Sequence, residues 1–179
     1  AVVQMKKTGL NGLILDLRYN PGGLLDEAVN VCSMFLEKGV VVSQEDNQGR
    51  QTDVQELRPG QSAMLQGVPV TVLVNEGSAS ASEITAGALR DHKVATLVGT
   101  HSFGKGSVQQ LYPFPDDSAL KLTIARFYSP SGKVIDKKGI EPDVSLKMEP
   151  RFVAKVKHDT QLQKAIELIN KQAARAEAP

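Results

Sequence analysis

Short, unbroken apolar runs are the clearest feature of the hydrophobic pattern along this chain. Three of them, at residues 13–17, 70–74 and 94–98, hold almost no polar residue. Strands of a parallel or mixed sheet are buried on both faces and therefore form continuous apolar runs of this kind. The pattern predicts three buried strands.

Helical stripes follow these strands. After a sharp Asn-Pro-Gly-Gly break at 20–23, apolar side chains recur at helical spacing from Leu24 onwards, and two acids occupy the first turn, where the helix dipole favours them. We expect this helix to stop at Gly39. A second helix is expected over 82–90, and a terminal helix from 159 to about 174, with the last residues fraying.

Alternating residues predict further strands that pair with one another. The expected positions are 40–43, 108–114, 120–128 and an edge segment at 139–146, with 45–69 as hairpin and surface connection. Strand–helix alternation early and paired strands late predict an α/β (α+β) fold, in which one mixed β-sheet core is flanked by helices.

The chain divides into a core at 1–158 and a C-terminal helix with a frayed tail at 159–179. Residues 1–10 are typical of the end of an amphipathic helix entered midway, and this stretch holds neither a Met start nor the apolar region of a signal peptide. We therefore interpret the sequence as a fragment of a longer polypeptide.

Composition narrows the function classes. The 179 residues carry 21 Lys+Arg and 20 Asp+Glu, a net charge of +1, which argues against a nucleic-acid module held by a basic field. The single cysteine, Cys32, excludes an intrachain disulfide framework and a cysteine-based zinc site. No apolar run approaches the roughly 18 residues of a membrane span.

The most informative stretch for chemistry is residues 70–90, where a buried strand enters a small-residue turn and then a helix. A serine at such a turn exposes its hydroxyl beside the unpaired N–H groups of the helix N-terminus. Ser78, Ser80 and Ser82 are the candidates. The plainer interpretation is that these serines only cap the helix, which serine does well.

A serine nucleophile needs a base. Of the three histidines, His92 and His158 are expected at the surface, and His101 gives no Ser–Asp–His order. Lys105 lies between two glycines in a loop that leaves a buried strand. It would act as a base if desolvation favoured its neutral amine, whereas most loop lysines are simply solvated.

Two glycine-bearing turns have alternative interpretations. Residues 99–105 satisfy the G-x-x-x-x-G-K pattern of a phosphate-binding loop, but Gly106 replaces the required Ser or Thr and a strand rather than a helix is expected next. The turn at Gly22 and Gly23 either aims backbone N–H groups at a developing oxyanion or is an ordinary tight turn.

Several ordered blocks resemble one family. The blocks at 15–23 (LDLRYNPGG), 74–83 (VNEGSASASE) and 99–106 (GTHSFGKG) resemble the carboxyl-terminal processing peptidases, also called tail-specific proteases (peptidase family S41). The stretches at 122–132 (LTIARFYSPSG) and 139–143 (GIEPD) are similar to the same family. The resemblance covers about residues 10–146 and implies a ClpP/crotonase-like catalytic core.

The resemblance implies roles for individual residues. Ser80 would be the nucleophile and Lys105 the general base of a Ser–Lys dyad, with Gln109 positioning the lysine amine. The oxyanion hole would take the backbone N–H of Ala81 and that of either Gly22 or Gly23. No cofactor and no metal are implied.

The resemblance also implies partners and location. The substrate would be the C-terminal tail of a protein or peptide. A PDZ domain of the same parent polypeptide, which is missing from this sequence, would assist, and an adaptor protein or a homo-oligomer is conceivable. The family implies an extracytoplasmic setting such as the bacterial periplasm or cell envelope.

Three other functions were weighed against a serine endopeptidase. A catalytically silent fragment could act as a protein-binding scaffold. A crotonase-type acyl-CoA enzyme would share the core but does not need a serine–lysine pair. Nucleotide binding through residues 99–105 is the weakest.

Overall fold

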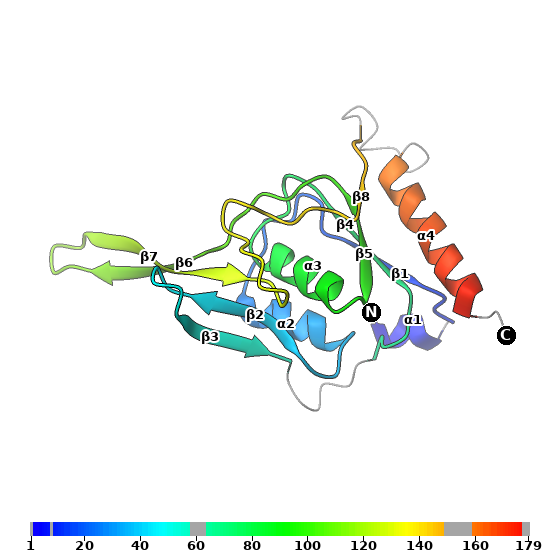
Figure 1. Ribbon diagram of the computed structural model, residues 1–179, viewed down its shortest axis with the longest axis horizontal. Helices are drawn as coiled ribbons and strands as arrows, with labels where there is room; N and C mark the ends of the chain where they lie inside the picture. Colours follow the sequence, from blue (N-terminus) through cyan, green and yellow to red (C-terminus); the bar gives the residue numbers. More distant parts are fainter. Residues whose placement is uncertain (1, 8, 58–63, 149–158, 177–179) are drawn as a thin grey trace.

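The computed structural model describes residues 2–7, 9–57, 64–148 and 159–176 (Figure 1). The helices are α1 (Val2–Lys7), α2 (Leu25–Ser33), α3 (Ala81–Asp91) and α4 (Thr160–Ala176). The strands are β1 (Leu13–Asp16), β2 (Val40–Glu45), β3 (Gln51–Glu56), β4 (Val70–Val74), β5 (Ala95–Gly99), β6 (Ser107–Pro113), β7 (Ala119–Tyr128) and β8 (Val144–Ser145).

The strands form two sheets of four strands each. The first has the order β1-β4-β5-β8 and all its pairs are parallel, whereas the second has the order β3-β2-β7-β6 and all its pairs are antiparallel. The predicted α/β class, with buried central strands and an edge segment after residue 139, is confirmed. The expectation of one mixed sheet is corrected, because the parallel and antiparallel strands belong to separate sheets.

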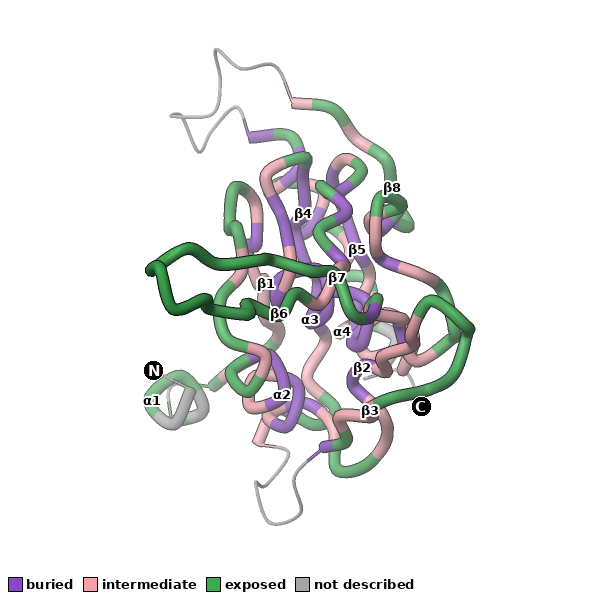
Figure 2. The backbone as a smooth tube through the Cα atoms, turned by 90° about the vertical axis from the view of Figure 1, so that its left-hand side faces the viewer, coloured by how far each residue is buried: buried purple, intermediate pink, exposed green. Residues whose placement is uncertain are grey.

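Helices cover both faces of the parallel sheet (Figure 1). On one face, Val70, Val72 and Val74 of β4 belong to the main core together with residues of α2 and α3. On the other face, Leu73 and Val98 pack against Ala165 of α4. Because successive side chains of a strand point to opposite faces, the fully buried run of β4 serves both layers. The helix α3 is buried along most of its length, as Figure 2 shows.

The helix after the Asn-Pro-Gly-Gly break is shorter than the sequence predicts. It ends at Ser33 rather than near Gly39, although Phe35 beyond it is still buried. The reason lies in the backbone: the carbonyl of Met34 accepts a hydrogen bond from the N–H of Leu65 at 2.8 Å. In a helix that continued to Gly39, this carbonyl would instead accept from the N–H of Lys38, four residues further on.

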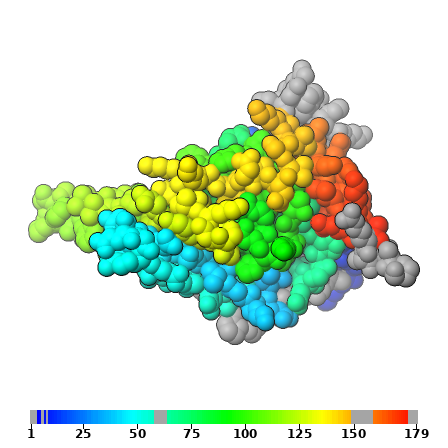
Figure 3. All heavy atoms as spheres, viewed as in Figure 1, coloured from blue at the N-terminus to red at the C-terminus, as the bar shows by residue number. Residues whose placement is uncertain are grey.

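The strands β6 and β7 form a long two-stranded ribbon that projects from the body of the molecule (Figures 1 and 3). Only the base of β7 joins the rest of its sheet, through residues Arg126, Phe127 and Tyr128, which pair with β2. The predicted pair of strands joined by a turn is confirmed.

The predicted terminal helix is also confirmed, as α4. The expected fraying falls partly on residues 177–179, and His158 is also among the residues outside the described part of the chain. Within the described ranges, no helix has the length and apolar character that a bilayer crossing requires.

Candidate active site

The turn between β4 and α3 is held in place by Ser78. This serine is fully buried, and its hydroxyl donates to the carbonyl of Leu17 at 2.7 Å and accepts from the N–H of Asn75 at 2.9 Å. The side-chain oxygen of Asn75 in turn accepts from the N–H groups of Tyr19 and Gly77. The turn is therefore fixed to the chain that leaves β1, and the hydroxyl of Ser78 is used for structure.

Ser80 has a different environment. It is half-buried, it immediately precedes α3, and its backbone has φ 56° and ψ −120°. A positive φ at a non-glycine residue is sparsely populated and persists only where the surroundings enforce it. A strained serine between a strand and a helix is the arrangement that presents a nucleophile at the top of an α/β sheet.

The Asn-Pro-Gly-Gly turn lies directly against Ser80. A methyl group on Gly22 would lie 2.5 Å from Ala79 O and 2.7 Å from the backbone nitrogen of Ala81, and Gly22 has φ +94°. Only glycine fits this position. The sequence-predicted residues Gly22, Ala81 and Ser80 are thus brought together by the fold.

The backbone N–H groups of Gly22, Gly23 and Ala81 differ in whether they already donate a hydrogen bond. The N–H of Gly22 donates to the side-chain oxygen of its neighbour Asn20 at 3.0 Å. Among the described residues, no hydrogen-bond acceptor is recorded for the N–H of Gly23 or of Ala81. These two groups are the ones available to a ligand.

Glu83 connects the Ser80 turn to the loop that carries Lys105. It is 1% exposed, and its two carboxylate oxygens accept four hydrogen bonds. One oxygen receives the N–H of Ser80 at 2.9 Å and the N–H of Lys105 at 2.8 Å. The other receives the hydroxyl of Ser102 at 2.5 Å and the N–H of Gly104 at 2.7 Å. One buried carboxylate therefore holds the backbones of both predicted dyad residues.

The Lys105 loop is also fixed from its other side. Gly106 packs so closely on the segment after β7 that a methyl group there would lie 2.2 Å from the nitrogen of Asp136. The N–H of Lys137 donates to Gly104 O, and Ser102 Oγ accepts from the N–H of Ile140. The backbone of the loop is therefore held by hydrogen bonds on both sides.

The side chain of Lys105 is exposed, and within the described residues no hydrogen bond joins its amine to the Ser80 hydroxyl. Gln109 is likewise exposed, near the start of β6 and opposite Thr123. The fold thus brings the backbones of Ser80 and Lys105 to one site, but it does not close the contact between their side chains.

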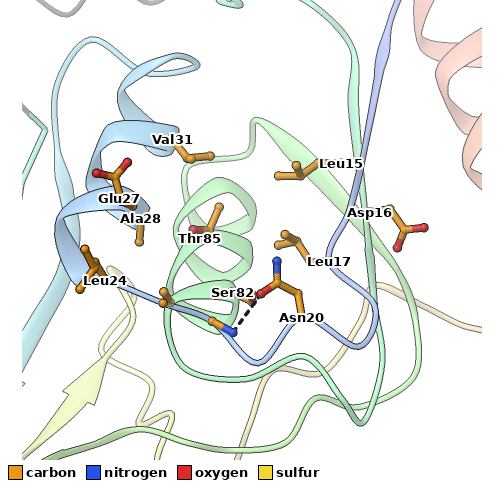
Figure 4. Close-up of a pocket in the computed structure, with 13 residues that line it drawn as sticks. Leu15, Asp16, Leu17, Asn20, Leu24, Glu27, Ala28, Val31, Ser82 and Thr85 are labelled. Atoms are coloured by element: carbon orange, nitrogen blue, oxygen red, sulfur yellow. Dashed lines mark hydrogen bonds between the residues drawn. The ribbon is translucent and has the colours of Figure 1, made fainter. Parts of the chain in front are cut away.

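A cavity of about 350 Å³ opens beside the Ser80 turn (Figure 4). Gly22, Gly23 and Ala81 contribute to its rim. Its walls are mainly apolar and come from β1, α2, α3 and the segment between β1 and α2, and they include Leu15, Leu17, Leu24, Ala28 and Val31. A side chain bound here would lie next to the free N–H groups of Gly23 and Ala81.

Two histidines and the single cysteine have other surroundings. His92 lies with Nε2 2.7 Å from Val40 O, and His101 with Nδ1 2.9 Å from Ser102 O. Cys32 is fully buried, and this burial raises the pKa of its thiol to about 12, so it is not a thiolate at neutral pH. The nucleotide-binding hypothesis is wrong for this loop, because β6 follows where a phosphate-binding loop needs a helix.

The sequence reasoning missed two residues. Glu83 follows Ser80 with the spacing of a capping box, a signal that could have found it. Arg18 directly follows the apolar run of β1, and its guanidinium binds Asp16 at 2.7 Å and Asp159 at 2.8 Å. It thereby ties the start of α4 to the chain that leads into the glycine turn.

These features define the class of the protein. It is an α/β protein with a strained serine at a strand-to-helix elbow, free amides beside the serine and a lysine loop fixed to the same turn; a strained serine at such an elbow is typical of α/β folds that carry a serine nucleophile. Comparison with known proteins then gives the family: the model of peptidase family S41 matches residues 1–146. The chain belongs to that family.

Individual relatives agree. The chain is 52% identical over 136 residues to the "Carboxy-terminal-processing protease" of Bartonella bacilliformis, a match that covers 75% of this chain and 31% of that protein. It is 45% identical over 148 residues to the "Probable CtpA-like serine protease" of Staphylococcus epidermidis, with coverage of 82% and 30%.

The solved structure of the photosystem II D1 C-terminal processing protease superposes with a TM-score of 0.76 at 41% identity, covering 82% of this chain and 37% of that one. The chain therefore spans about a third of the length of the relatives it matches.

Proposed function

We propose that this chain carries the catalytic core of a serine endopeptidase that cleaves proteins near their C-termini. One observation carries the proposal: Glu83 binds the backbone N–H groups of Ser80 and Lys105 with one oxygen, so that the strained serine and the lysine loop form one site. Membership of the S41 family supports the same chemistry.

Ser80 acts as the nucleophile and Lys105 as the general base. Because Lys105 is exposed, its amine must turn toward Ser80 before it can accept the proton. A bound peptide that covers the site would exclude water and favour the neutral amine that a base requires. In this closed arrangement Gln109, four residues further on, holds the amine.

The oxyanion hole consists of the N–H groups of Ala81 and Gly23. Gly23 is preferred to Gly22 because the N–H of Gly22 already donates to Asn20. The N–H of Ala81 is the first of α3, and amides at a helix N-terminus stabilise negative charge that develops on a carbonyl oxygen; the N–H of Gly23 would be the second donor.

The reaction proceeds in two halves. Lys105 takes the proton of the Ser80 hydroxyl while the oxygen attacks the peptide carbonyl carbon, and the carbonyl electrons move onto the oxyanion. As the intermediate collapses, the C–N bond breaks and Lys105 gives its proton to the leaving amine. Water, deprotonated by Lys105, then attacks the acyl-enzyme, and the proton returns to Ser80.

The apolar cavity beside the oxyanion site receives the side chain that precedes the cleaved bond. Its Leu, Ala and Val lining favours an apolar side chain at that position.

The remaining assignments follow the family. The substrate is the C-terminal tail of a protein or peptide, and a PDZ domain of the parent polypeptide, an adaptor protein or a second subunit would help to present it. We place this activity outside the cytoplasm, in the bacterial periplasm or cell envelope.

A cleavage assay tests the proposal. A protein with an unstructured apolar tail is incubated with the native chain and with the variants Ser80→Ala and Lys105→Met, and the products are identified by mass. Cleavage near the C-terminus is expected for the native chain, and a loss of at least about 1,000-fold for either variant. Unchanged cleavage by Ser80→Ala would disprove the assignment of the nucleophile.

A second function has one observation in its favour. The open contact between Ser80 and Lys105 is also compatible with a catalytically silent scaffold that binds other proteins. Tail binding without cleavage, by the native chain and by Ser80→Ala alike, would support that function instead.

A further inference from the structure

The projecting ribbon of β6 and β7 carries a row of exposed apolar side chains on one face. Tyr112 lies opposite Leu120, and Leu122 and Ile124 follow at alternate positions of β7. Because alternate residues of a strand share a face, these side chains and Phe114 form one surface, here called the ribbon face. Its five members are 41% to 49% exposed.

The ribbon face has no cover in the described part of the chain. From Arg126 toward the tip of the ribbon, that is at residues 119–125 of β7, the two strands pair only with each other. The ribbon stands clear of the body (Figure 3). An isolated two-stranded ribbon is marginally stable in water. Gln110, opposite Leu122, lies among the five side chains on this face, and Lys121 belongs to the opposite face with Leu111. The surface is therefore uncharged and mainly apolar, so it fits a mainly apolar partner.

The size of the ribbon face argues against a second copy of the chain as that partner. At about 200 Å² for a large apolar side chain, its five members expose roughly 400 Å². A stable protein–protein interface uses about 800 Å² from each side. An exposed apolar patch of a few hundred Å² is often a functional site on a monomer, and a peptide segment covers less area than a folded partner does.

The ribbon is continuous with the candidate active site. β6 begins two residues after Lys105, and at its base the N–H of Phe127 donates to Gly106 O at 2.7 Å. The seven residues of β6 span about 23 Å at 3.3 Å per residue. A chain whose cleaved bond lies at Ser80 would reach along the ribbon with about seven further residues.

We propose that the ribbon face binds an apolar stretch of the substrate polypeptide that lies about seven residues from the cleaved bond. This inference rests on the proposed endopeptidase function. Substrates with such a stretch would bind more tightly than short peptides with the same cleaved bond.

The experiment compares short peptides, which carry two residues on each side of the cleaved bond, with long peptides extended on either side by a seven-residue apolar stretch. The test variant is Leu120→Ser/Leu122→Ser, with Leu122→Ser as a milder form. The matched control is Leu111→Ser, which removes an exposed leucine from the opposite face of the same ribbon. Circular dichroism verifies folding of each variant.

For the long peptides extended on one of the two sides of the cleaved bond, the double variant should raise KM about tenfold and leave kcat unchanged. Cleavage of the short peptides should not change, and the Leu111→Ser control should behave as the native chain. An equal loss on short and long peptides, or no loss on either, would overturn the proposal. So would an oligomer, seen in sedimentation velocity, that dissociates only in the double variant, because a second copy would then cover the ribbon face.

A binding measurement separates this proposal from the enzymatic one. Fluorescent long peptides are titrated onto the Ser80→Ala chain with and without the two ribbon substitutions. Weaker binding in the presence of the substitutions supports the ribbon face even if no peptide is ever cleaved. Equal binding rejects the ribbon face even if cleavage is observed.

Discussion

Ser78 and Ser80 lie two positions apart, but their hydroxyl groups face different surroundings. Ser78 is fully buried and its hydroxyl bonds to the backbone of Leu17 and Asn75. Ser80 is half-buried and has a strained backbone at the start of α3. A hydroxyl that already satisfies buried backbone groups is unavailable for attack on a substrate, so the contrast favours Ser80.

The two glycines of the oxyanion turn allow a matched test at the same scale. In Gly22→Ala, the new methyl group would lie 2.5 Å from Ala79 O at a φ of +94°, so the turn must move. In Gly23→Ala, the methyl group meets no atom within 4 Å and the backbone N–H is retained. We expect a loss of kcat of about 100-fold or more for Gly22→Ala and little change for Gly23→Ala, measured on one peptide substrate. Equal activities would contradict this geometry.

At the scale of elements, Glu83 joins α3 to the loop between β5 and β6. Its four hydrogen bonds all come from donors, so the Glu83→Gln variant would set an amide N–H₂ against N–H or O–H groups. We expect kcat to fall about 100-fold through misplacement of Ser80 and Lys105, with a smaller effect on KM.

The control for Glu83 is Glu76→Gln. Glu76 is an exposed acid of the turn between β4 and α3, and its carboxylate accepts one hydrogen bond, from the hydroxyl of Thr100. It should retain full activity. If both variants lose kcat to the same degree, the effect is not specific to the buried carboxylate.

Arg18 and Asp159 join α4 to the end of β1. Burial disfavours the charged form of Asp159, but the hydrogen bond and charge of Arg18, together with the backbone N–H groups of Leu162 and Gln161, outweigh it and lower the pKa of Asp159 below its ordinary value. A lowered folded pKa means that the charged group stabilises the fold above the unfolded pKa of about 3.9, and that this contribution is lost as the pH falls through the folded pKa.

Urea denaturation of Asp159→Asn at several pH values tests this linkage. At pH 7 the variant should be less stable than the native chain by about 2 kcal/mol, and the difference should shrink below about pH 4. Glu167→Gln, on the exposed face of the same helix, is the control and should change the stability little. A difference that is independent of pH would contradict the role assigned to the Asp159 charge.

At the scale of the whole molecule, the sequence predicted the elements better than their assembly. The unbroken apolar runs identified β1, β4 and β5, because strands with two covered faces are built mainly from apolar residues. The division into two sheets was not predictable in this way. Burial constrains which side chains a strand carries, but the choice of neighbour depends on contacts between distant segments.

The candidate site was likewise only partly predictable from the sequence. The order of motifs suggested Ser80, Lys105 and the glycine turn, but the role of Glu83 depends on a loop 19 to 22 residues away along the chain. The end of α2 depends likewise on a bond from Leu65 to Met34. Whether the side chains of Ser80 and Lys105 touch is decided by rotamers, which the sequence pattern does not encode.

The central claim is that Ser80 is a nucleophile activated by Lys105, and covalent labelling tests it most directly. The chain is treated with a serine-directed fluorophosphonate, and the modified peptide is identified by mass spectrometry. We expect one adduct per chain, on Ser80, with none on Ser80→Ala and labelling at least about tenfold slower on Lys105→Met. An adduct on another residue, or equal labelling rates for the native chain and Lys105→Met, would contradict the account.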